Sequence, residues 1–484
     1  MLGFSGRTAR QKCLTTVTHP AHINRLPQVE RSSTWQANPE SRMIWQPMRV
    51  KTPWIDALKE SREARVSESI SMPTTMKLDF TPKEIQESSY KAVCTLEFLS
   101  ISPSCYFRKE NELVLILIQI LPLTRDPWLL DTYLNASGHI RLGTLMKDVD
   151  ALAGIVANRH TGDGVTTVTA AVDRIMIDNP LMEIFDLEIS GKITYTSGRS
   201  SMDISCQVAK ARLAGEIAQP DDVLITCTFT MVSLDPKTKA PVSVPPIILR
   251  TEEERNIFKA GEENYQTKRA LRKRSVLLKA PDDEESLAAH SQWINHTVTS
   301  DSSSNSKPQA LTGKTTLRST MIMQPSDRNR HNFMIFGGFL LKETFELAFC
   351  CAASFAQSRP NFLSLDPSKF DNPVPVGSLL YLSATVSYTE SIELEGDECK
   401  YTKVHVHVNS EVRDVDTKMK KPTGIFNYTF LVEKDIQVVP ETYSDFMLWT
   451  EARRRALQVA ADPTQKVSTL RALQNSAKGK SRVL

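Results

Sequence analysis

Two short stretches of this chain combine residue types that can act on a carbonyl group. The first, 329–338, ends in Gly337 and Gly338, directly before an apolar stretch that predicts a helix. Glycines at a helix start let a ligand approach the backbone, and they leave N–H groups free to hold a carbonyl oxygen or an oxyanion. Asn329 and Asn332 precede them and add amide groups that donate hydrogen bonds. Tight packing of helix on sheet explains a Gly-Gly pair equally well, so both interpretations stay open.

The second stretch, 142–159, predicts another helix and supplies a carboxylate. Asp150 follows Gly143 by two helical turns and therefore lies on the same face as the helix start. Its neighbours along the chain are apolar, and a carboxylate that borders packed surface is costly without a partner or a task. Asp148 points to another face, where we expect it to be solvated.

Both stretches belong to an internal duplication. Three pairs of segments share an offset of 193 residues, which indicates a repeat independently of any family. They are Asp173 with Asp366, Asp178-Asn179-Pro180 with Asp371-Asn372-Pro373, and Tyr195-Thr196 with Tyr388-Thr389. Counted from the glycine at each helix start, Gly143 and Gly338, the second copy holds Phe345 where the first holds Asp150, and Glu346 follows it. The two copies are therefore chemically asymmetric.

Each copy predicts one long helix followed by strands. The helices are 142–159 and 337–355, each with one broad apolar face. Segments that alternate apolar and polar residues predict antiparallel strands with one wet face: 166–177, 187–196, 202–209 and 223–232, then 379–389, 400–412 and 424–432. This order predicts an α+β fold in which each antiparallel sheet wraps its helix.

The signatures of several other protein classes are missing. The chain has no G-x-S-x-G elbow, no G-x-x-x-x-G-K-[ST] loop and no strand-linked G-x-G-x-x-G, so we expect no cofactor. His405 and His407 share a strand face with Lys403 and Asn409, which favours a solvated face over a metal site. The eight cysteines lack metal-ligand spacing and are interpreted as buried thiols of a reducing compartment. The net charge of +3 lies mainly in the termini and one linker, which argues against a nucleic-acid partner.

The ends of the chain differ from its centre. The first 29 residues contain Arg and Lys but no Asp or Glu, so 1–75 is interpreted as a mitochondrial presequence with a disordered lead-in. A disordered tail that happens to lack acids is the alternative. A linker at 237–314 is expected to be helical near its start and loose near Ser302, and a basic tail at 441–484 to form a short helix. For both basic runs, 268–274 and 453–455, a solvated face is preferred over a phosphate site. No segment reaches the ~20 apolar residues of a membrane-spanning helix.

The segment 93–119 interrupts the approach to the first helix and has no evident counterpart in the second copy. Val93-Cys94 can be encoded by GTATGT and Gln119 by CAG, which are the ends of many fungal introns. We therefore interpret 93–119 as a possible translated intron.

Several motifs resemble one family, the mitochondrial acyl-coenzyme A thioesterases of the 9-type subgroup. In the second copy these are Arg328-Asn329, Phe336-Gly337-Gly338-Phe339-Leu340-Leu341, Phe345-Glu346-Leu347-Ala348, Ser358-Arg359-Pro360 and Pro373-Val374-Pro375-Val376-Gly377-Ser378-Leu379-Leu380. In the first copy, Met146-Lys147 to Asp150, Ala153-Gly154-Ile155-Val156-Ala157 and Arg159-His160 look like the helix of related cytosolic acyl-CoA hydrolases. The resemblance spans roughly 127–443.

The resemblance implies two tandem hotdog domains, at 80–236 and 315–440, that form an intramolecular pseudo-dimer. It implies hydrolysis of acyl-CoA thioesters in the mitochondrial matrix, and a homo-oligomer, a trimer of double-hotdog units, without membrane insertion. In the family an Asp of one domain's helix acts with an Asn before the other's. In this sequence the matching residues are Asp150 and Asn329. Asn332 is the alternative to Asn329, because the stretch up to Gly337 is one residue longer than in the family.

The expected substrate-contacting residues are Gly337, Gly338, His331 and Glu346. A hotdog hydratase-dehydratase, for which His331 is the nearby candidate, and an acyl-CoA binding module without catalysis are the alternatives.

Overall fold

The computed structural model describes residues 83–84, 105–110, 114–136, 138–162, 164–177, 184–212, 219–271, 280–299, 308–329, 334–393, 400–415 and 419–461. The predicted presequence, residues 93–104, the segment near Ser302, His331 and Asn332 lie outside these residues.

The first half contains one long helix and an antiparallel sheet, as the sequence predicts. The helix is α4 (Leu142–Thr161), preceded by α3 (Pro127–Tyr133). The strands are β4 (Thr166–Val172), β5 (Ile175–Ile177), β6 (Leu187–Thr196), β7 (Ser201–Lys210) and β8 (Val223–Leu234), with the 3-10 turn η1 (Pro220–Asp222) before β8. Apolar residues on the inner strand faces pack on α4, which lies across the sheet. Burial of this face is the main force that holds helix on sheet.

The second half repeats this plan. The helix is α7 (Gly337–Ala356), and the strands are β11 (Leu317–Ile322), β12 (Asn361–Leu365), β13 (Ser368–Phe370), β14 (Leu379–Glu393), β15 (Lys400–Arg413) and β16 (Lys420–Val432). Short 3-10 turns flank β11, namely η3 (Thr312–Thr315) and η4 (Pro325–Asp327). Two parallel strand pairs lie apart from the main sheet: β1 (Lys83–Glu84) with β9 (Ile247–Ile248), and β10 (Gln309–Leu311) with β17 (Gln437–Val439). The tandem hotdog architecture is thereby confirmed.

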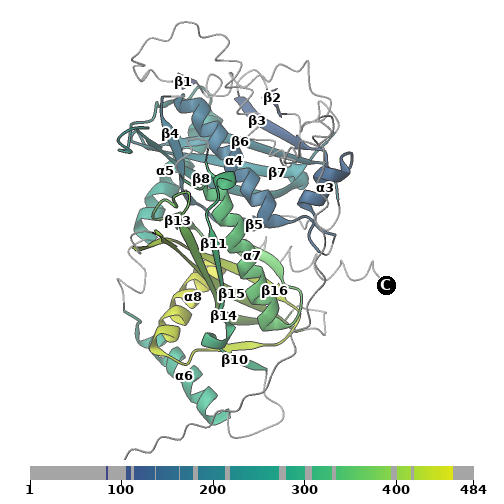
Figure 1. Cartoon of the computed structure of the whole chain (residues 1–484), viewed down its shortest axis with the longest axis vertical. Coiled ribbons are helices and arrows are strands. Elements are labelled where there is room, and N and C mark those ends of the chain that lie inside the picture. Colours follow the sequence, from purple (N-terminus) through teal and green to yellow (C-terminus); the bar gives the residue numbers. More distant parts are fainter. Residues whose placement is uncertain are drawn as a thin grey trace, which may run out of the picture. The chain divides into compact units, whose positions relative to one another are not determined.

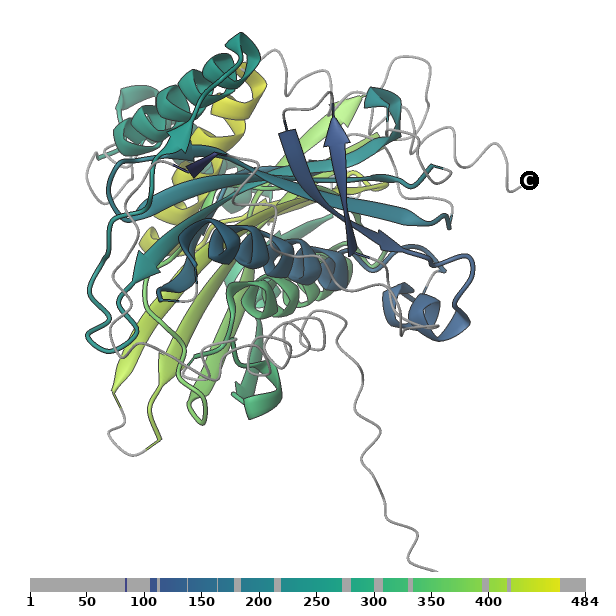
Figure 2. The same ribbon diagram turned by 90° about the horizontal axis from the view of Figure 1, so that it is seen from above.

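The sheets of the two halves join along a seam. Strand β5 pairs with β12, with Ile175 opposite Leu365, and β4 pairs with β13, with Val172 opposite Ser368. Thirteen of the described strands thereby form one antiparallel sheet. The helices α4 and α7 lie side by side, each against strands of its own half (Figures 1 and 2). The two helix starts can therefore contribute to one site.

The segment 93–119 has a counterpart in the second half, contrary to our expectation. Its described part forms β2 (Cys105–Glu110) and most of β3 (Val114–Leu121). Strand β3 lies beside β6 with Leu117 opposite Gly191, as β11 lies beside β14 with Leu317 opposite Ala384. Gly191 and Ala384 are themselves 193 residues apart. The last residue of the segment fits poorly, because Gln119 is fully buried and neither amide atom has a hydrogen-bond partner among the described residues.

The intron interpretation stays a prediction, which sequencing of the mature transcript tests. A message that runs continuously through 93–119 contradicts it. Thermal unfolding cannot replace this test, because a chain without 93–119 also lacks β2 and most of β3.

Three further helices follow the sheets. They are α5 (Glu252–Leu271), α6 (Asp283–Thr299) and α8 (Tyr443–Ala461). The predicted helix at the start of the linker is confirmed by α5, whereas α6 was not predicted. Tyr195 packs on Phe258 and Tyr265 of α5, and its repeat Tyr388 packs on Trp449 of α8. The repeated tyrosines therefore mark where each sheet receives a covering helix.

Two predictions of solvated faces are wrong because α8 lies on the second sheet. The face of His405 and His407 is covered, and burial lowers the pKa of His405 to about 3 and that of His407 to about 4, with Arg455 nearby lowering both. The run 453–455 is not solvated either, since each arginine contacts a carboxylate. Among the described residues, no helix has both the length and the apolar character to cross a bilayer.

Candidate active site

Asp150 lies on the face of α4 that meets the start of α7. Its side chain is 2% exposed. Oδ2 accepts a hydrogen bond from the backbone N–H of Gly338 at 2.5 Å, and Oδ1 accepts one from the Thr169 hydroxyl of β4 at 2.8 Å. Asp150 and Gly338, both predicted from the sequence, are therefore in direct contact across the two halves.

The environment of Asp150 brings the pKa of its carboxyl group closer to neutral pH. Burial raises the pKa of Asp150 to about 6, although the hydrogen bonds from Thr169 and Gly338 act in the opposite direction. The neighbouring thiols of Cys206 and Cys227 are buried and their pKa values are raised, so they are neutral. A carboxylate with a pKa near the working pH is suited to general base catalysis.

The contact between α4 and α7 depends on glycine at position 338. A Cβ there would lie 2.6 Å from the carbonyl oxygen of Lys147 and 3.0 Å from the Cβ of Asp150. At Gly337, a Cβ would lie 3.0 Å from the Cβ of Thr169 and 3.3 Å from the Phe370 ring. The Gly-Gly pair is thus required for close packing, which was the alternative explanation of the pair. The same packing brings the Gly338 N–H to the Asp150 carboxylate.

The equivalent position at the start of α4 has no carboxylate. There Gly143 of α4 approaches Lys342 and Phe345 of α7, as Gly338 approaches Lys147 and Asp150. Phe345 thus replaces Asp150, as expected. The strand registers extend this comparison. Thr169 lies opposite Met231 directly before a bulge, and Phe362 lies opposite Phe430 directly before a bulge.

Phe362 therefore replaces Thr169. Instead of a hydroxyl bonded to a carboxylate, the second position holds two rings, Phe345 and Phe362, packed edge to face at 5.4 Å. They continue into Tyr428 and Phe430. This aromatic cluster therefore has no carboxylate at the place that Asp150 occupies in the first half.

Asn329 precedes α7 in a short turn. Its backbone N–H donates to the carbonyl oxygen of Met334, and the Phe336 N–H donates to that of Asp327. The side-chain Oδ1 of Asn329 is buried without a hydrogen-bond partner among the described residues. The amide oxygen of Asn329 therefore faces the interior of the protein.

Asp148 is placed differently from our expectation, whereas the expected substrate contact of Glu346 stays a prediction. Glu346, expected to contact substrate, accepts a hydrogen bond at 2.7 Å from Arg141 Nε, at the start of α4, and so links the two halves. Asp148, expected to be solvated, is only 5% exposed and accepts a hydrogen bond from the Tyr133 hydroxyl. Burial raises the pKa of Tyr133 well above its ordinary value, and the Asp148 carboxylate raises it further. Helix α3, from which Tyr133 comes, was not predicted.

Thr169 was missed by the sequence analysis. It lies in a strand that also contains Thr166 and Thr167, and threonine is common in strands. Nothing in the sequence distinguishes the hydroxyl that meets Asp150, because that contact depends on the placement of helix on sheet.

Comparisons with known proteins identify relatives of this chain. No protein-family model matches the chain. It is 32% identical over 358 residues to the bovine mitochondrial acyl-coenzyme A thioesterase 9, covering 72% of this chain and 78% of that protein. It is 33% identical over 347 residues to the human mitochondrial acyl-coenzyme A thioesterase 9, covering 69% and 75%. A solved structure of a putative oleoyl thioesterase from Lactobacillus plantarum is 10% identical and covers 67% of this chain and 97% of that one, but its TM-score of 0.36 is too low to support an assignment. On its similarity to the curated relatives, the chain belongs to the mitochondrial acyl-coenzyme A thioesterase 9 family of thioester hydrolases.

Proposed function

We propose that this thioesterase hydrolyses acyl-CoA to a free carboxylic acid and CoA at one composite site per chain. The site consists of Asp150 of the first domain and the start of α7 in the second. The observation that carries the proposal is the buried carboxylate of Asp150, held by Thr169 and by the Gly338 N–H. The aromatic cluster at the equivalent position supports a single site.

Asp150 has two possible roles. As a general base it takes a proton from water while the water oxygen attacks the thioester carbonyl, and the tetrahedral intermediate then expels CoA thiolate, which takes up a proton. As a nucleophile it attacks the carbonyl itself, expels the thiolate and forms a mixed anhydride, which water hydrolyses. Hydrolysis in ¹⁸O-labelled water under single-turnover conditions separates the routes, since only the anhydride route can place ¹⁸O in Asp150.

The developing oxyanion needs hydrogen-bond donors. We assign this role to the amide Nδ2 of Asn329 together with the N–H of Gly337, because the N–H of Gly338 already donates to Asp150. One such donor contributes about 3 kcal/mol to transition-state stabilisation. Asn332, outside the described residues, remains the alternative to Asn329. Alanine substitution of each in turn distinguishes them, because the catalytic amide is the one whose loss lowers kcat.

Release of free thiol from a panel of acyl-CoA esters tests the proposal and its rivals. Hydrolysis gives one thiol for each ester consumed. A hydratase-dehydratase, with His331 as its candidate, would change the absorbance of an enoyl-CoA without thiol release, and an acyl-CoA binding module would do neither. No thiol release at any acyl length would exclude the enzyme proposal.

The pKa of Asp150 predicts the pH dependence of the reaction. The carboxylate must be ionised to act, so kcat/KM is expected to rise through about pH 6 and to level off above it. Thr169→Val removes a hydrogen bond that lowers this pKa, so its acid limb is expected at higher pH. Rate profiles from pH 4.5 to 9, a range chosen to bracket that pKa, measure both. An acid limb at the pH of an ordinary carboxyl group in both proteins would contradict the role of Asp150.

The relatives are mitochondrial by name, and we infer import of this chain into the matrix through residues 1–75. A fluorescent protein fused to 1–75 is expected in mitochondria, and a diffuse cytosolic signal contradicts the inference.

We also expect acyl-CoA as the binding partner and a trimer of double-hotdog chains. Light scattering measures the mass, and a monomer would exclude the trimer.

A further inference from the structure

Asp366 binds two arginines that come from different parts of the fold. Its Oδ1 lies 2.9 Å from Nη2 of Arg174, between β4 and β5, and its Oδ2 lies 3.3 Å from Nε of Arg455 on α8. The Asp366 side chain is 6% exposed and the arginine side chains are 17% and 20% exposed. Ion pairs this far from solvent are weakly screened and hold a defined geometry. We call Arg174, Asp366 and Arg455 the seam triad.

The seam triad lies where the two sheets join. Arg174 directly precedes Ile175, which is opposite Leu365, and Asp366 directly follows Leu365. On the other side of Asp366, Lys369 of β13 is opposite Ala171 of β4. The triad therefore ties both pairs of strands that form the seam.

The same strands carry the groups around Asp150. Thr169, which donates to Asp150, lies on β4 two residues before Ala171. Phe370, at the end of β13, lies against Gly337 at the start of α7. A shift of β13 against β4 would therefore change the distance between the carboxylate and the helix start.

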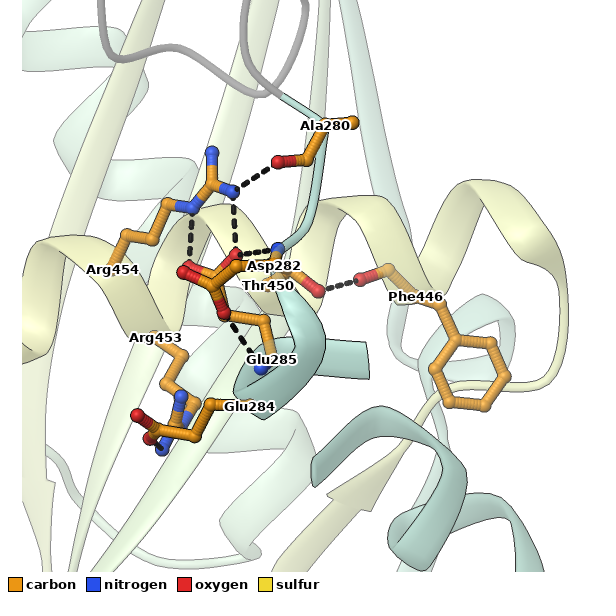
Figure 3. A network of polar contacts seen from close by, with 8 residues as sticks. All are labelled: Ala280, Asp282, Glu284, Glu285, Phe446, Thr450, Arg453 and Arg454. Carbon is orange, nitrogen blue, oxygen red and sulfur yellow. Dashed lines mark hydrogen bonds and ion pairs between the residues drawn. The ribbon is translucent and has the colours of Figure 1, made fainter. Parts of the chain in front are cut away.

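Helix α8 presents Arg455 from a fixed position. The preceding residue, Arg454, forms a bidentate pair with Glu285 of α6, at 2.6 Å for Nε to Oε1 and 2.6 Å for Nη2 to Oε2. Glu285 also accepts from the Asp282 N–H, and Asp282 in turn accepts from the Glu285 N–H, a capping box at the start of α6 (Figure 3). Arg453 contacts Glu284 at the outer edge of this network.

The other charged or titratable neighbours of Arg455 leave Asp366 as its main partner. Glu451, one turn earlier on α8, lies 3.7 Å away and is more exposed. His405 and His407, on the strand face below, have their pKa values lowered by burial and are neutral near pH 7.

We propose that Arg174, Asp366 and Arg455 are positioning residues for hydrolysis, and that α8 acts through them to fix the seam on which the Asp150 site is built. They touch no reacting atom. The inference rests on the proposed composite site. It gives α8 a part in positioning that site, although α8 lies far from Asp150 in the sequence.

Arg455→Gln tests this in the full chain, with Arg453→Gln, two residues earlier on α8, as the matched control. We expect kcat of Arg455→Gln to fall by about tenfold at pH 8, with KM within about twofold, because small displacements of reacting groups are costly. Within the described part of the chain, Asp150 faces the neutral groups of Thr169, Gly338, Cys206 and Cys227, so its acid limb should move to lower pH as water enters. Arg453→Gln should match the unmodified protein in all three values.

Hydrogen–deuterium exchange supplies a readout without turnover. In Arg455→Gln, amides of β4 and β13 should exchange faster, whereas those of β15 should not. If Arg455→Gln fails to fold, Arg174→Gln and Asp366→Asn carry the same expectations. Unchanged kcat, acid limb and β4 exchange in a folded variant overturn the proposal, as does an equal loss in Arg453→Gln. If the unmodified chain releases no thiol, the proposed function fails, and the exchange data still decide whether the triad fixes the seam.

Discussion

Replacing Asp150 by Asn is expected to lower kcat for acyl-CoA hydrolysis by about 10²–10⁴-fold, whichever of its two roles Asp150 has. Asn has nearly the same shape, and its Oδ1 can still accept from the Gly338 N–H while its Nδ2 donates to the Thr169 hydroxyl oxygen. It cannot take up a proton or attack a carbonyl. The substitution therefore removes the chemistry and leaves the packing of α4 on α7 nearly intact. Thiol release at pH 8, together with thermal unfolding, measures both effects.

Asp148→Asn is the matched control. Asp148 is also buried on α4, but it accepts from Tyr133 instead of facing α7. We expect this variant to retain most of the activity, with any loss explained by its lower stability. If Asp150→Asn turned over at the unmodified rate, the assignment of Asp150 would be wrong. Equal losses in the two variants would indicate a structural effect of either substitution on α4.

Gly338→Ala is expected to have the second largest effect, because it damages activity and stability together. The new methyl would lie 2.6 Å from the Lys147 carbonyl oxygen and 3.0 Å from the Asp150 Cβ, so α7 and α4 must move apart. Such overpacking costs about 1–3 kcal/mol. The movement also lengthens the hydrogen bond from Gly338 to Asp150, and we expect kcat to fall by about 10²-fold.

The control Gly154→Ala is expected to change the stability in the opposite direction. Gly154 also lies in α4, but a Cβ there would have no atom within 4 Å. Alanine should stabilise the helix by about 0.5–1 kcal/mol and leave kcat unchanged. Melting temperatures and kcat of both variants are the measurements. Wild-type activity in Gly338→Ala would show that the close approach of the helices is not needed for catalysis.

The sequence predicted the local elements well because periodicity is a local property. Both long helices and the predicted strand segments appear within a few residues of their predicted ends, with 166–177 divided into β4 and β5. Other elements were not predicted, among them β2, β3, β11 to β13, α3 and α6. Helix α6 and the cover provided by α8 depend on contacts such as Arg454 with Glu285, which are 169 residues apart. No pattern within either segment indicates its partner.

The sequence likewise indicated one part of the candidate site and left the other part to the tertiary structure. The residue types and the repeat indicated Asp150, the Gly-Gly helix start and the substitution of Phe345, since each follows from position along one helix. The pairing of Asp150 with Gly338 spans 188 residues, and only the crossing of α4 and α7 decides it. Tertiary structure alone also selected Thr169 among three threonines, buried Asp148 against Tyr133, and brought Arg174, Asp366 and Arg455 together. Hydrogen bonds and ion pairs of this kind depend on distances of a few ångströms between elements, and a hydrophobic pattern determines which faces meet but not their exact alignment.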